Sequence, residues 1–208
     1  IGMAIGDLNG DGKLDIAVAN IGSVSVFINT SNSGSISFAA KIDLPSGTEP
    51  YSVSIGDLDG DGKPELVVAN GIANTVSVFR NISTTGTIAF ASKVDFVTGT
   101  SPYHRVAIGD LDRDGKPDLV TTSSNSNPPV ISVLRNTSSP GSITASSFAA
   151  KVNFLAGSTP YGVSIADLDG DGKLDLAIPN QVGNSVSVFK NTSSPGSITA
   201  SSFASKVD

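Results

Sequence analysis

The sequence contains no cysteine and a single histidine, His104. Without cysteine the chain forms no disulfide, carries no catalytic thiol and offers no zinc–thiolate site. One histidine is too few for a metal site built from several imidazoles. Basic residues are also scarce, 13 against 19 acidic ones, and the net charge of −6 argues against strong non-specific binding of nucleic acid.

Long apolar runs are missing as well. No stretch approaches the roughly 18 residues of a membrane-spanning helix, so we expect no membrane span. The first residue is not a start methionine and no signal segment is visible, so we expect a mature region or a fragment. The chain is instead rich in small and hydroxyl residues, with 22 glycines, 32 serines and 15 threonines among 208 residues. This mixture favours short strands and many turns over long helices.

An internal repeat organises the chain. One acidic loop recurs four times, and the spacings between its first aspartates are 50, 53 and 57 residues. Each loop is followed by an apolar run, an alternating run such as Val-Ser-Val-Phe, and a Ser/Thr/Gly segment. The terminal repeats resemble the internal ones, so we expect a segment of a longer array. The single array divides into repeats at approximately 1–50, 51–102, 103–160 and 161–208.

The pattern within a repeat predicts four short strands and no helix. In the second repeat the expected strands lie at 53–55, 66–69, 75–79 and 88–96. The run at 66–69 is continuously apolar, as in a strand buried on both faces. Four short strands in about 50 residues are typical of one β-propeller blade, so the predicted fold is all-β. The third repeat has an extra residue at His104-Arg105, where we expect a β-bulge.

The acidic loop has the form Asp-x-[Asp/Asn]-x-Asp-Gly-Lys-x-[Asp/Glu]. Oxygen-bearing side chains at positions 1, 3, 5 and 9 suit a hard cation with six to eight ligands, chiefly Ca²⁺. The glycine at position 6 allows a sharp turn. We expect the lysine at position 7 to contribute its backbone carbonyl while its side chain points into solvent. Position 12 lies in a strand and is not the glutamate of an EF-hand loop.

About four Ca²⁺ ions per chain are therefore expected. The loops hold 15 of the 19 acidic residues, whose mutual repulsion a bound cation would relieve. The alternative is four solvated turns without metal. Asn9 replaces an acid in the first loop, so this site should bind more weakly. The predicted ligands are Asp7, Asn9, Asp11, Lys13 and Asp15; Asp57, Asp59, Asp61, Lys63 and Glu65; Asp110, Asp112, Asp114, Lys116 and Asp118; Asp167, Asp169, Asp171, Lys173 and Asp175.

The loop, with the Leu-Val-Val-Ala run that follows it in the second repeat, resembles the FG-GAP/VCBS repeats of integrin-α-like β-propellers, in particular bacterial ones. The resemblance covers essentially the whole chain. It implies a bladed β-propeller with Ca²⁺ in loops between strands, secreted or displayed on the cell surface. Such propellers usually close with about seven blades, whereas four units are present here. The Phe-Gly pair of the family is also missing.

One Asn-x-Ser sequon occurs at the same phase of every repeat. It predicts either a column of N-linked glycans or a repeated turn residue after the Val-Ser-Val-Phe strand, and duplication alone would give the common phase. The candidate asparagines are Asn29, Asn81, Asn136 and Asn191.

Catalysis has little support, because His104 occurs in one repeat only and no nucleophile elbow lies near it. The sequence favours a non-catalytic extracellular calcium-binding scaffold or adhesion module whose loops meet a protein or glycan ligand. Two alternatives remain open. In the first, the chain is the subunit of a homopolymeric fibre that self-assembles through its open repeat ends. In the second, it is the glycan-binding or accessory propeller domain of a larger secreted enzyme.

Overall fold

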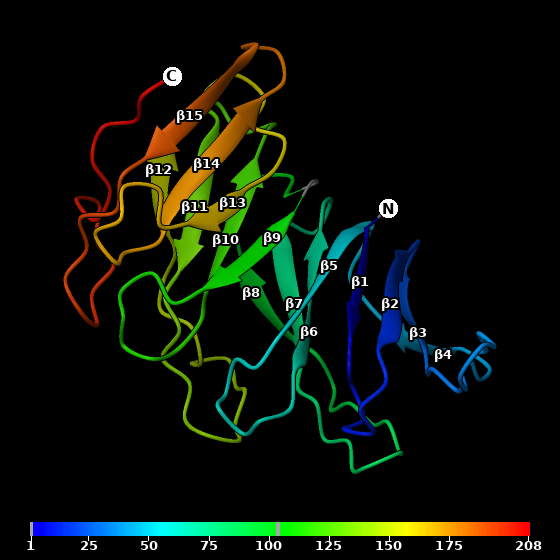
Figure 1. The fold of residues 1–208 in the computed structure, drawn as a ribbon. Coiled ribbons are helices and arrows are strands. Elements are labelled where there is room, and N and C mark those ends of the chain that lie inside the picture. Colours follow the sequence, from blue (N-terminus) through cyan, green and yellow to red (C-terminus); the bar gives the residue numbers. More distant parts are fainter. Residues whose placement is uncertain (1, 103–104) are drawn as a thin grey trace.

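The computed structural model describes residues 2–102 and 105–208, which form fifteen strands in four antiparallel sheets, one for each repeat (Figure 1). The all-β prediction is therefore confirmed. Within this part of the chain, no helix is long and apolar enough to cross a membrane. The strands are β1 (Met3–Gly6), β2 (Asp15–Asn20), β3 (Ser23–Phe27) and β4 (Ile42–Pro45); β5 (Pro50–Gly56), β6 (Glu65–Asn70), β7 (Thr75–Phe79) and β8 (Val94–Val97); β9 (Val106–Gly109), β10 (Asp118–Ser123), β11 (Val130–Leu134) and β12 (Val152–Leu155); β13 (Ser164–Ala166), β14 (Asp175–Asn180) and β15 (Ser185–Phe189).

Each sheet is a meander in which the strands pair in chain order. In the second sheet, Val67 of β6 lies between Ser54 of β5 and Val78 of β7. All residues of β6 and β10 are buried, which confirms that the continuously apolar run is a strand covered on both faces. The outermost strand, β8, alternates between exposed and covered residues.

The fourth strand of a repeat is shorter than the sequence pattern predicts. In the second repeat only Val94–Val97 pairs with β7. The residues before it turn back on the segment after β7, and Ala91 donates its N–H to the carbonyl of Arg80 at 2.9 Å. Local pairing within this hairpin therefore removes residues 88–91 from the sheet. We call the hairpin the arm of its repeat, at residues 28–39, 80–91, 135–149 and 190–204.

The fourth sheet departs from the expected four strands. It contains β13, β14 and β15, and Val207 forms a single bridge with Val188. The two backbone hydrogen bonds of that bridge measure 2.7 and 2.9 Å. One bridge does not make a ladder, so this sheet has three strands.

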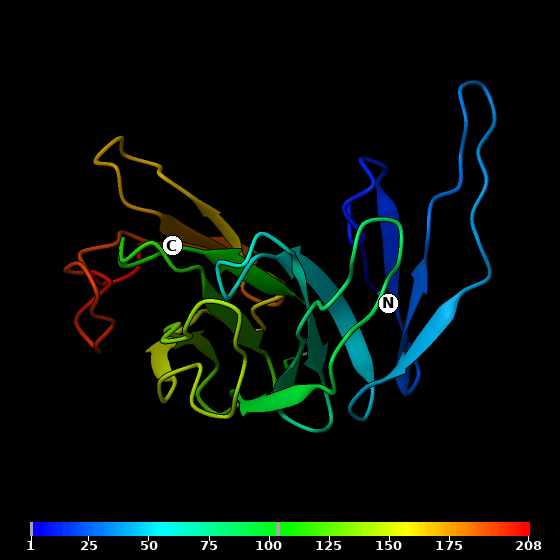
Figure 2. The same cartoon turned by 90° about the horizontal axis from the view of Figure 1, so that it is seen from below.

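The sheets stand side by side, with the first and fourth at opposite ends of the row (Figure 2). The innermost strands β1, β5, β9 and β13 contact one another in this order. Three apolar clusters join consecutive sheets, and each contains the leucine at loop position 2 of the earlier repeat. These leucines, Leu8, Leu58 and Leu111, are at most 1% exposed.

A glycine at the end of the innermost strand permits this close packing. A Cβ on Gly56 would lie 3.1 Å from Cδ1 of Ile108 in the next repeat. A Cβ on Gly6 would lie equally close, 3.1 Å, to Cγ2 of Ile55. Because glycine has no side chain, the isoleucine of the following repeat packs directly against the backbone.

His104 lies outside the described residues, and so does the site of the β-bulge predicted there. The structure describes the chain again from Arg105, and β9 begins at Val106.

Candidate metal centres

The acidic loops connect the first and second strands of each sheet. In the second repeat the loop begins at Asp57, directly after β5, and ends at Glu65, the first residue of β6. Gly60 and Gly62 within it have left-handed backbone conformations, with φ of 69° and 82°, which glycine adopts without steric cost. In the third repeat Arg113 takes the first of these positions, with φ of 55°.

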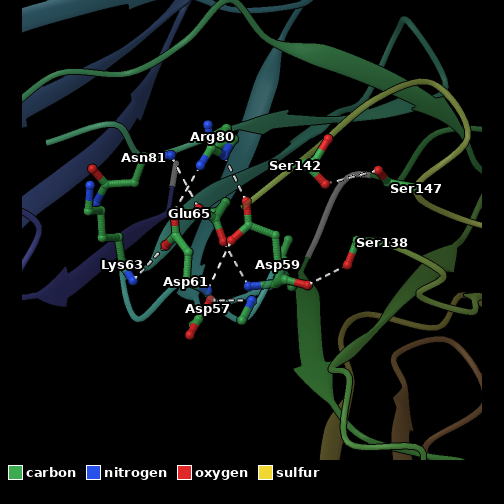
Figure 3. A network of polar contacts seen from close by, with 12 residues as sticks. Asp57, Asp59, Asp61, Lys63, Glu65, Arg80, Asn81, Ser138, Ser142 and Ser147 are labelled. Atoms are coloured by element: carbon green, nitrogen blue, oxygen red, sulfur yellow. Dashed lines mark hydrogen bonds and ion pairs between the residues drawn. The ribbon is translucent and has the colours of Figure 1, made fainter. Parts of the chain in front are cut away.

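The carboxylate at position 1 holds the loop in shape. Oδ1 of Asp57 accepts the N–H of Gly60 at 2.8 Å, and Oδ2 accepts that of Gly62 at 3.0 Å. Asp61, at position 5, accepts the N–H of Lys63 at 3.0 Å. These bonds curl the backbone around the carboxylates, which gather on one side of the loop (Figure 3).

Carboxylate oxygens meet in three of the four loops. In each of three triads, one oxygen per residue lies within 4.8 Å of the others: Asp57, Asp59 and Asp61; Asp110, Asp112 and Asp118; Asp167, Asp169 and Asp175. Three converging hard oxygen donors suit a divalent cation such as Ca²⁺. The triads therefore could hold metal ions, and they coincide with predicted ligand positions.

The first loop differs, because Asn9 occupies position 3. Within residues 2–102 and 105–208, Asp7, Asp11 and Asp15 form no triad of this kind. Asn9 is 2% exposed, and its Oδ1 accepts the N–H of Asp11 at 3.1 Å. This loop has the same local shape with one carboxylate fewer.

The acid at position 9 has a second task, because it anchors the loop to the sheet. One oxygen of Asp118 accepts the N–H of Leu111 at 3.0 Å, and the other accepts that of Asn136 at 2.8 Å. The same two bonds occur in the other repeats, at Asp15, Glu65 and Asp175. All four acids are at most 2% exposed.

Burial raises the pKa of three of the acids at position 9, namely Asp15, Glu65 and Asp118. Loss of solvation raises the pKa of Asp118 to about 7, and the nearby Asp112 and Asp114 raise it further, whereas the two backbone N–H groups oppose the shift. Burial likewise raises the pKa of Glu65 to about 7 and that of Asp15 above its ordinary value. A neighbouring cation would reverse this effect by favouring the charged form.

Sequence reasoning missed the basic residue that follows the third strand of a repeat. Nε of Arg80 donates to Asp59 at 2.8 Å, and Nη2 donates to Asp61 at 2.9 Å (Figure 3). Arg135 makes the same pair of contacts with Asp112 and Asp114, and Lys190 contacts Asp169 and Asp171.

The first repeat offers the signal that could have revealed this role. Ile28 occupies the position of the basic residue in the repeat whose loop carries Asn9 instead of an acid. Among the four repeats, the cation is therefore present where position 3 is charged and missing where it is neutral.

The lysine at position 7 behaves differently from the expectation. Nζ of Lys116 donates to the carbonyl of Ser138 at 2.7 Å, and Nζ of Lys173 donates to that of Ser193 at 2.9 Å. In these two repeats the side chain does not point freely into solvent, because it reaches a carbonyl of its own arm. Ligation of a metal by the lysine carbonyls stays a prediction.

Three of the four sequon asparagines lie at the joints between repeats. Nδ2 of Asn136 donates to the carbonyl of Leu58 at 2.8 Å and to that of Pro117 at 2.9 Å. Asn81 and Asn191 make the same two bonds, and all three residues are 0% exposed. In the folded chain these three amide nitrogens are not accessible, which favours the structural over the glycan interpretation.

The first three loops carry the attachment points for the next repeat. Besides Asn136, Oγ of Ser138 donates to the Leu58 carbonyl at 2.9 Å, and the N–H of Gly141 donates to the Asp59 carbonyl at 3.1 Å. The loop backbone is thus bonded to the arm that follows it. The third loop is bonded to the fourth arm in the same way, through Asn191, Ser193 and Gly196.

The comparison with solved structures adds little to this geometry. The chain is similar to a structure of the Tc holotoxin pore of Photorhabdus luminescens, with 18% sequence identity and a TM-score of 0.38. The alignment covers 98% of this chain and 12% of that one. The comparison with curated proteins gives no significant match.

Family comparisons agree with the repeats seen in the structure. The FG-GAP-like repeat matches residues 7–68 and 57–121, and the FG-GAP repeat matches residues 103–143 and 159–197. The matched segments contain the four acidic loops, and the four antiparallel sheets are consistent with propeller blades of this type. Since the FG-GAP-like matches alone span more than half of the residues, the chain belongs to the FG-GAP repeat family.

Proposed function

We propose that the chain is a non-catalytic extracellular scaffold in which Ca²⁺ stiffens the joints between repeats. One observation carries this proposal. The loop that gathers the carboxylates also presents the two carbonyls, Leu58 and Asp59 in the second repeat, that bind the following arm. An ion that orders the loop therefore orders the joint. In this way metal binding to local sites would stabilise the whole row of sheets.

Local charge supports a divalent ion. In the loop at 57–65, four carboxylates stand against Lys63 and Arg80, which leaves a charge of −2. The loop at 167–175 has the same balance with Lys173 and Lys190. One Ca²⁺ would neutralise each of these loops. A monovalent ion would leave residual repulsion among carboxylates in a partly buried setting.

Thermal unfolding in EDTA and in millimolar Ca²⁺, combined with elemental analysis of bound metal, tests the proposal. We expect three tighter sites and a weaker fourth site in the loop with Asn9. A site at 100 times its dissociation constant adds about 2.7 kcal/mol to the free energy of unfolding. Several such sites should raise the melting temperature by more than about 10 °C. No bound calcium and no shift would refute the structural role.

A single substitution makes the test specific to one loop. Asp110 accepts the N–H groups of Asp114 and Gly115 through its two oxygens, and Asp110→Asn keeps one of those acceptors. The variant should bind one ion fewer, and it should lose more stability in Ca²⁺ than in EDTA. The exposed Asp95, outside the loops, provides the control substitution Asp95→Asn, which should leave the metal count unchanged.

The non-catalytic part of the proposal is supported by the acids outside the loops, each of which is engaged locally. Asp43 pairs with Lys41 at 2.6 Å, and Asp95 and Asp208 pair with the lysines two residues before them. Glu49 accepts a hydrogen bond from Tyr51 at 3.2 Å. These contacts leave few carboxyl groups for acid–base chemistry.

An adhesion role would use the groove formed by the innermost strands. This groove, of about 840 Å³, is lined by β1, by β5 including Tyr51, by β9, and by Arg105 and Tyr161. Tyrosine and arginine side chains suit the sugar faces or the polar edges of a protein ligand. A glycan array tests this, and loss of binding in Tyr161→Ala would locate the ligand in the groove. In the accessory-domain alternative, this chain would be part of a longer protein whose catalytic domain lies elsewhere.

A further inference from the structure

The third repeat differs from the others at the end of its sheet that lies away from the acidic loop. Ser123 is the last residue of β10, at a position where the other repeats have an asparagine. In the second repeat, Nδ2 of that asparagine, Asn70, donates to Thr75 at 3.1 Å and to Ser77 at 2.8 Å. Oγ of Ser123 is buried and has no partner among the described residues. The third repeat has therefore lost the side chain that ties its second and third strands together.

A second difference removes an acid from the outer edge of the same sheet. In the other three repeats, a lysine pairs with the aspartate two residues later, and that aspartate also accepts a serine hydroxyl from the third strand. Asn153 takes the place of this aspartate. Its Oδ1 still accepts the hydroxyl of Ser132, at 2.8 Å. Its Nδ2, a donor, replaces the carboxylate oxygen that binds the lysine in the other repeats.

Lys151 consequently has no carboxylate partner. Its Nζ donates to the carbonyl of Thr98, and it forms no ion pair within residues 2–102 and 105–208. Nδ2 of Asn153 likewise has no acceptor in this part of the chain. The third repeat thus keeps a positive charge that its three counterparts neutralise, and it adds a second donor to it.

Both donors line a groove of about 440 Å³ between the second and third repeats. Val97 at the end of β8 and the turn at 124–129 also contribute to it, and this turn is longer than the corresponding turn at 71–74. The groove lies within the row of sheets, so the repeats on both of its sides are present. Among the described residues that line it, none is acidic.

Gly99 connects the groove to the buried serine. Its N–H donates to Oγ of Ser132 at 3.1 Å, and a Cβ on Gly99 would clash with Oγ of Ser123. Gly99 itself lines the groove. The replacement of asparagine by Ser123, the replacement of aspartate by Asn153 and the longer turn therefore all act on one place in the molecule.

We propose that this groove binds the carboxylate of an acidic sugar, a uronate unit of a glycan. The carboxylate would accept hydrogen bonds from Nζ of Lys151 and Nδ2 of Asn153, and it would supply the negative charge that an aspartate supplies in the other repeats. Hydrogen bonds between charged partners are stronger than neutral ones. The inference goes beyond the proposed scaffold and does not depend on metal, because the groove lies at the opposite end of β10 from the acidic loop.

The remaining surface of the groove favours a sugar over a bare anion. Val97, which is 66% exposed, and Pro128 offer apolar surface to the C–H face of a sugar ring. Its volume lies within the usual range of small-molecule sites, about 300–1,000 Å³. Amide and hydroxyl groups suited to ring hydroxyls come from Asn74, Thr100, Ser126 and Asn127.

An NMR titration of the ¹⁵N-labelled chain in millimolar Ca²⁺ tests the proposal. The probes are methyl glucuronide and methyl glucoside, which differ in the carboxylate alone. The glucuronide should shift the side-chain amide signal of Asn153 and the backbone signals of Gly99 and Thr100. The glucoside should bind about 10-fold more weakly or worse, because it cannot form the bond to the charged lysine. Equal binding of the two probes would overturn the proposal.

Three variants locate the site. Lys151→Met should weaken binding of the glucuronide by about 10-fold or more. Asn153→Asp restores the internal carboxylate of the other repeats, keeps the acceptor for Ser132 and should abolish binding. Lys41→Met is the matched control, because it removes the corresponding lysine of the first repeat, and it should leave binding unchanged. Unchanged signals outside the groove show that each variant is folded, and undiminished binding by Asn153→Asp would refute the site.

Two further probes distinguish a glycan from other sources of the carboxylate. Acetate supplies the charge without a sugar ring, and the capped dipeptide acetyl-glutamyl-glycine amide supplies it on a peptide. Both should bind more weakly than the glucuronide, since neither carries ring hydroxyls for the polar groups of the groove. Acetate or peptide binding as tight as that of the glucuronide would overturn the assignment to an acidic sugar.

Discussion

Arg80 donates from Nε to Oδ2 of Asp59 at 2.8 Å, although Asp59 is a member of a candidate metal triad. The side chain of Asp59 has no exposed surface. The same guanidinium reaches Asp61, so it draws two carboxylates of one loop together without a metal. An internal cation therefore balances part of the charge that Ca²⁺ would otherwise balance.

Replacing Arg80 should destabilise the metal-free protein more than the metal-bound protein. Arg80→Met leaves the buried Asp59 carboxylate unpaired, which should cost roughly 3 kcal/mol in EDTA. In Ca²⁺ the ion supplies positive charge to the same carboxylates, so the loss should be smaller. Chemical denaturation of both states measures the difference. Lys41→Met, at an exposed pair, is the control and should cost much less than Arg80→Met. Equal losses for Arg80→Met in EDTA and Ca²⁺ would contradict this view.

The first loop permits the converse experiment. Asn9→Asp creates the missing acid at a buried position in a repeat that has Ile28 in place of the basic residue, so the variant should be less stable than the natural chain in EDTA. In Ca²⁺ it should bind the fourth ion more tightly. Adding Ile28→Arg should restore stability in EDTA, because the pair then matches Asp59 and Arg80. Calcium titration and denaturant unfolding of the single and double variants measure both effects. A double variant no more stable in EDTA than Asn9→Asp alone would refute the pairing.

The sequence predicts the repeats and their loops well because these depend on local spacing. Aspartates at alternate positions and glycine at position 6 determine the loop regardless of its surroundings. The buried strand at 66–69 is likewise predicted from its apolar run. These features recur four times at one phase, which removes most of the ambiguity of a single copy.

Contacts between residues that lie far apart in the sequence could not be predicted from local spacing. Asn81 meets the carbonyl of Leu8 across 73 residues, and the motif around Asn81 reads equally well as a glycosylation site. The arms escaped prediction because alternation in residues 88–96 resembles a continuous strand, whereas pairing with the segment after β7 competes locally. The role of Arg80 depends on a contact with Asp59, 21 residues away, made across the sheet.

From the raised pKa values of Glu65 and Asp118 we predict an unusual dependence of stability on pH in the absence of metal. Burial raises the pKa of Glu65 and Asp118 to about 7 in the folded chain, above their values of 4.5 and 3.8 when unfolded. Folding therefore favours the protonated forms, and their contribution to stability is present below about pH 4 and lost as pH rises towards 7. In EDTA the protein should be more stable at pH 5 than at pH 8.

Asp118→Asn isolates one of these groups, since asparagine does not titrate. The stability difference between pH 5 and pH 8 should shrink by roughly 3 kcal/mol relative to the natural chain. Urea unfolding in EDTA at the two pH values gives this double difference, in which the cost of the altered hydrogen bonds cancels. In Ca²⁺ the natural chain should lose its decline, because a bound cation favours the charged carboxylate. An unchanged pH difference in the variant would show that Asp118 does not titrate in this range.

A comparison of Asn136 with Asn29 measures how much one hydrogen bond between repeats contributes to the free energy of unfolding. Asn136 and Asn29 each donate to a carbonyl of their own repeat, at 2.9 Å in both cases, and only Asn136 also bonds the preceding repeat. Asn136→Ala should therefore cost about 1–3 kcal/mol more than Asn29→Ala, since it leaves the Leu58 carbonyl with one donor fewer in a buried joint. Equilibrium denaturation in Ca²⁺ measures both variants. Equal costs would mean that the bond between repeats adds nothing, and the joint would then depend on apolar packing alone.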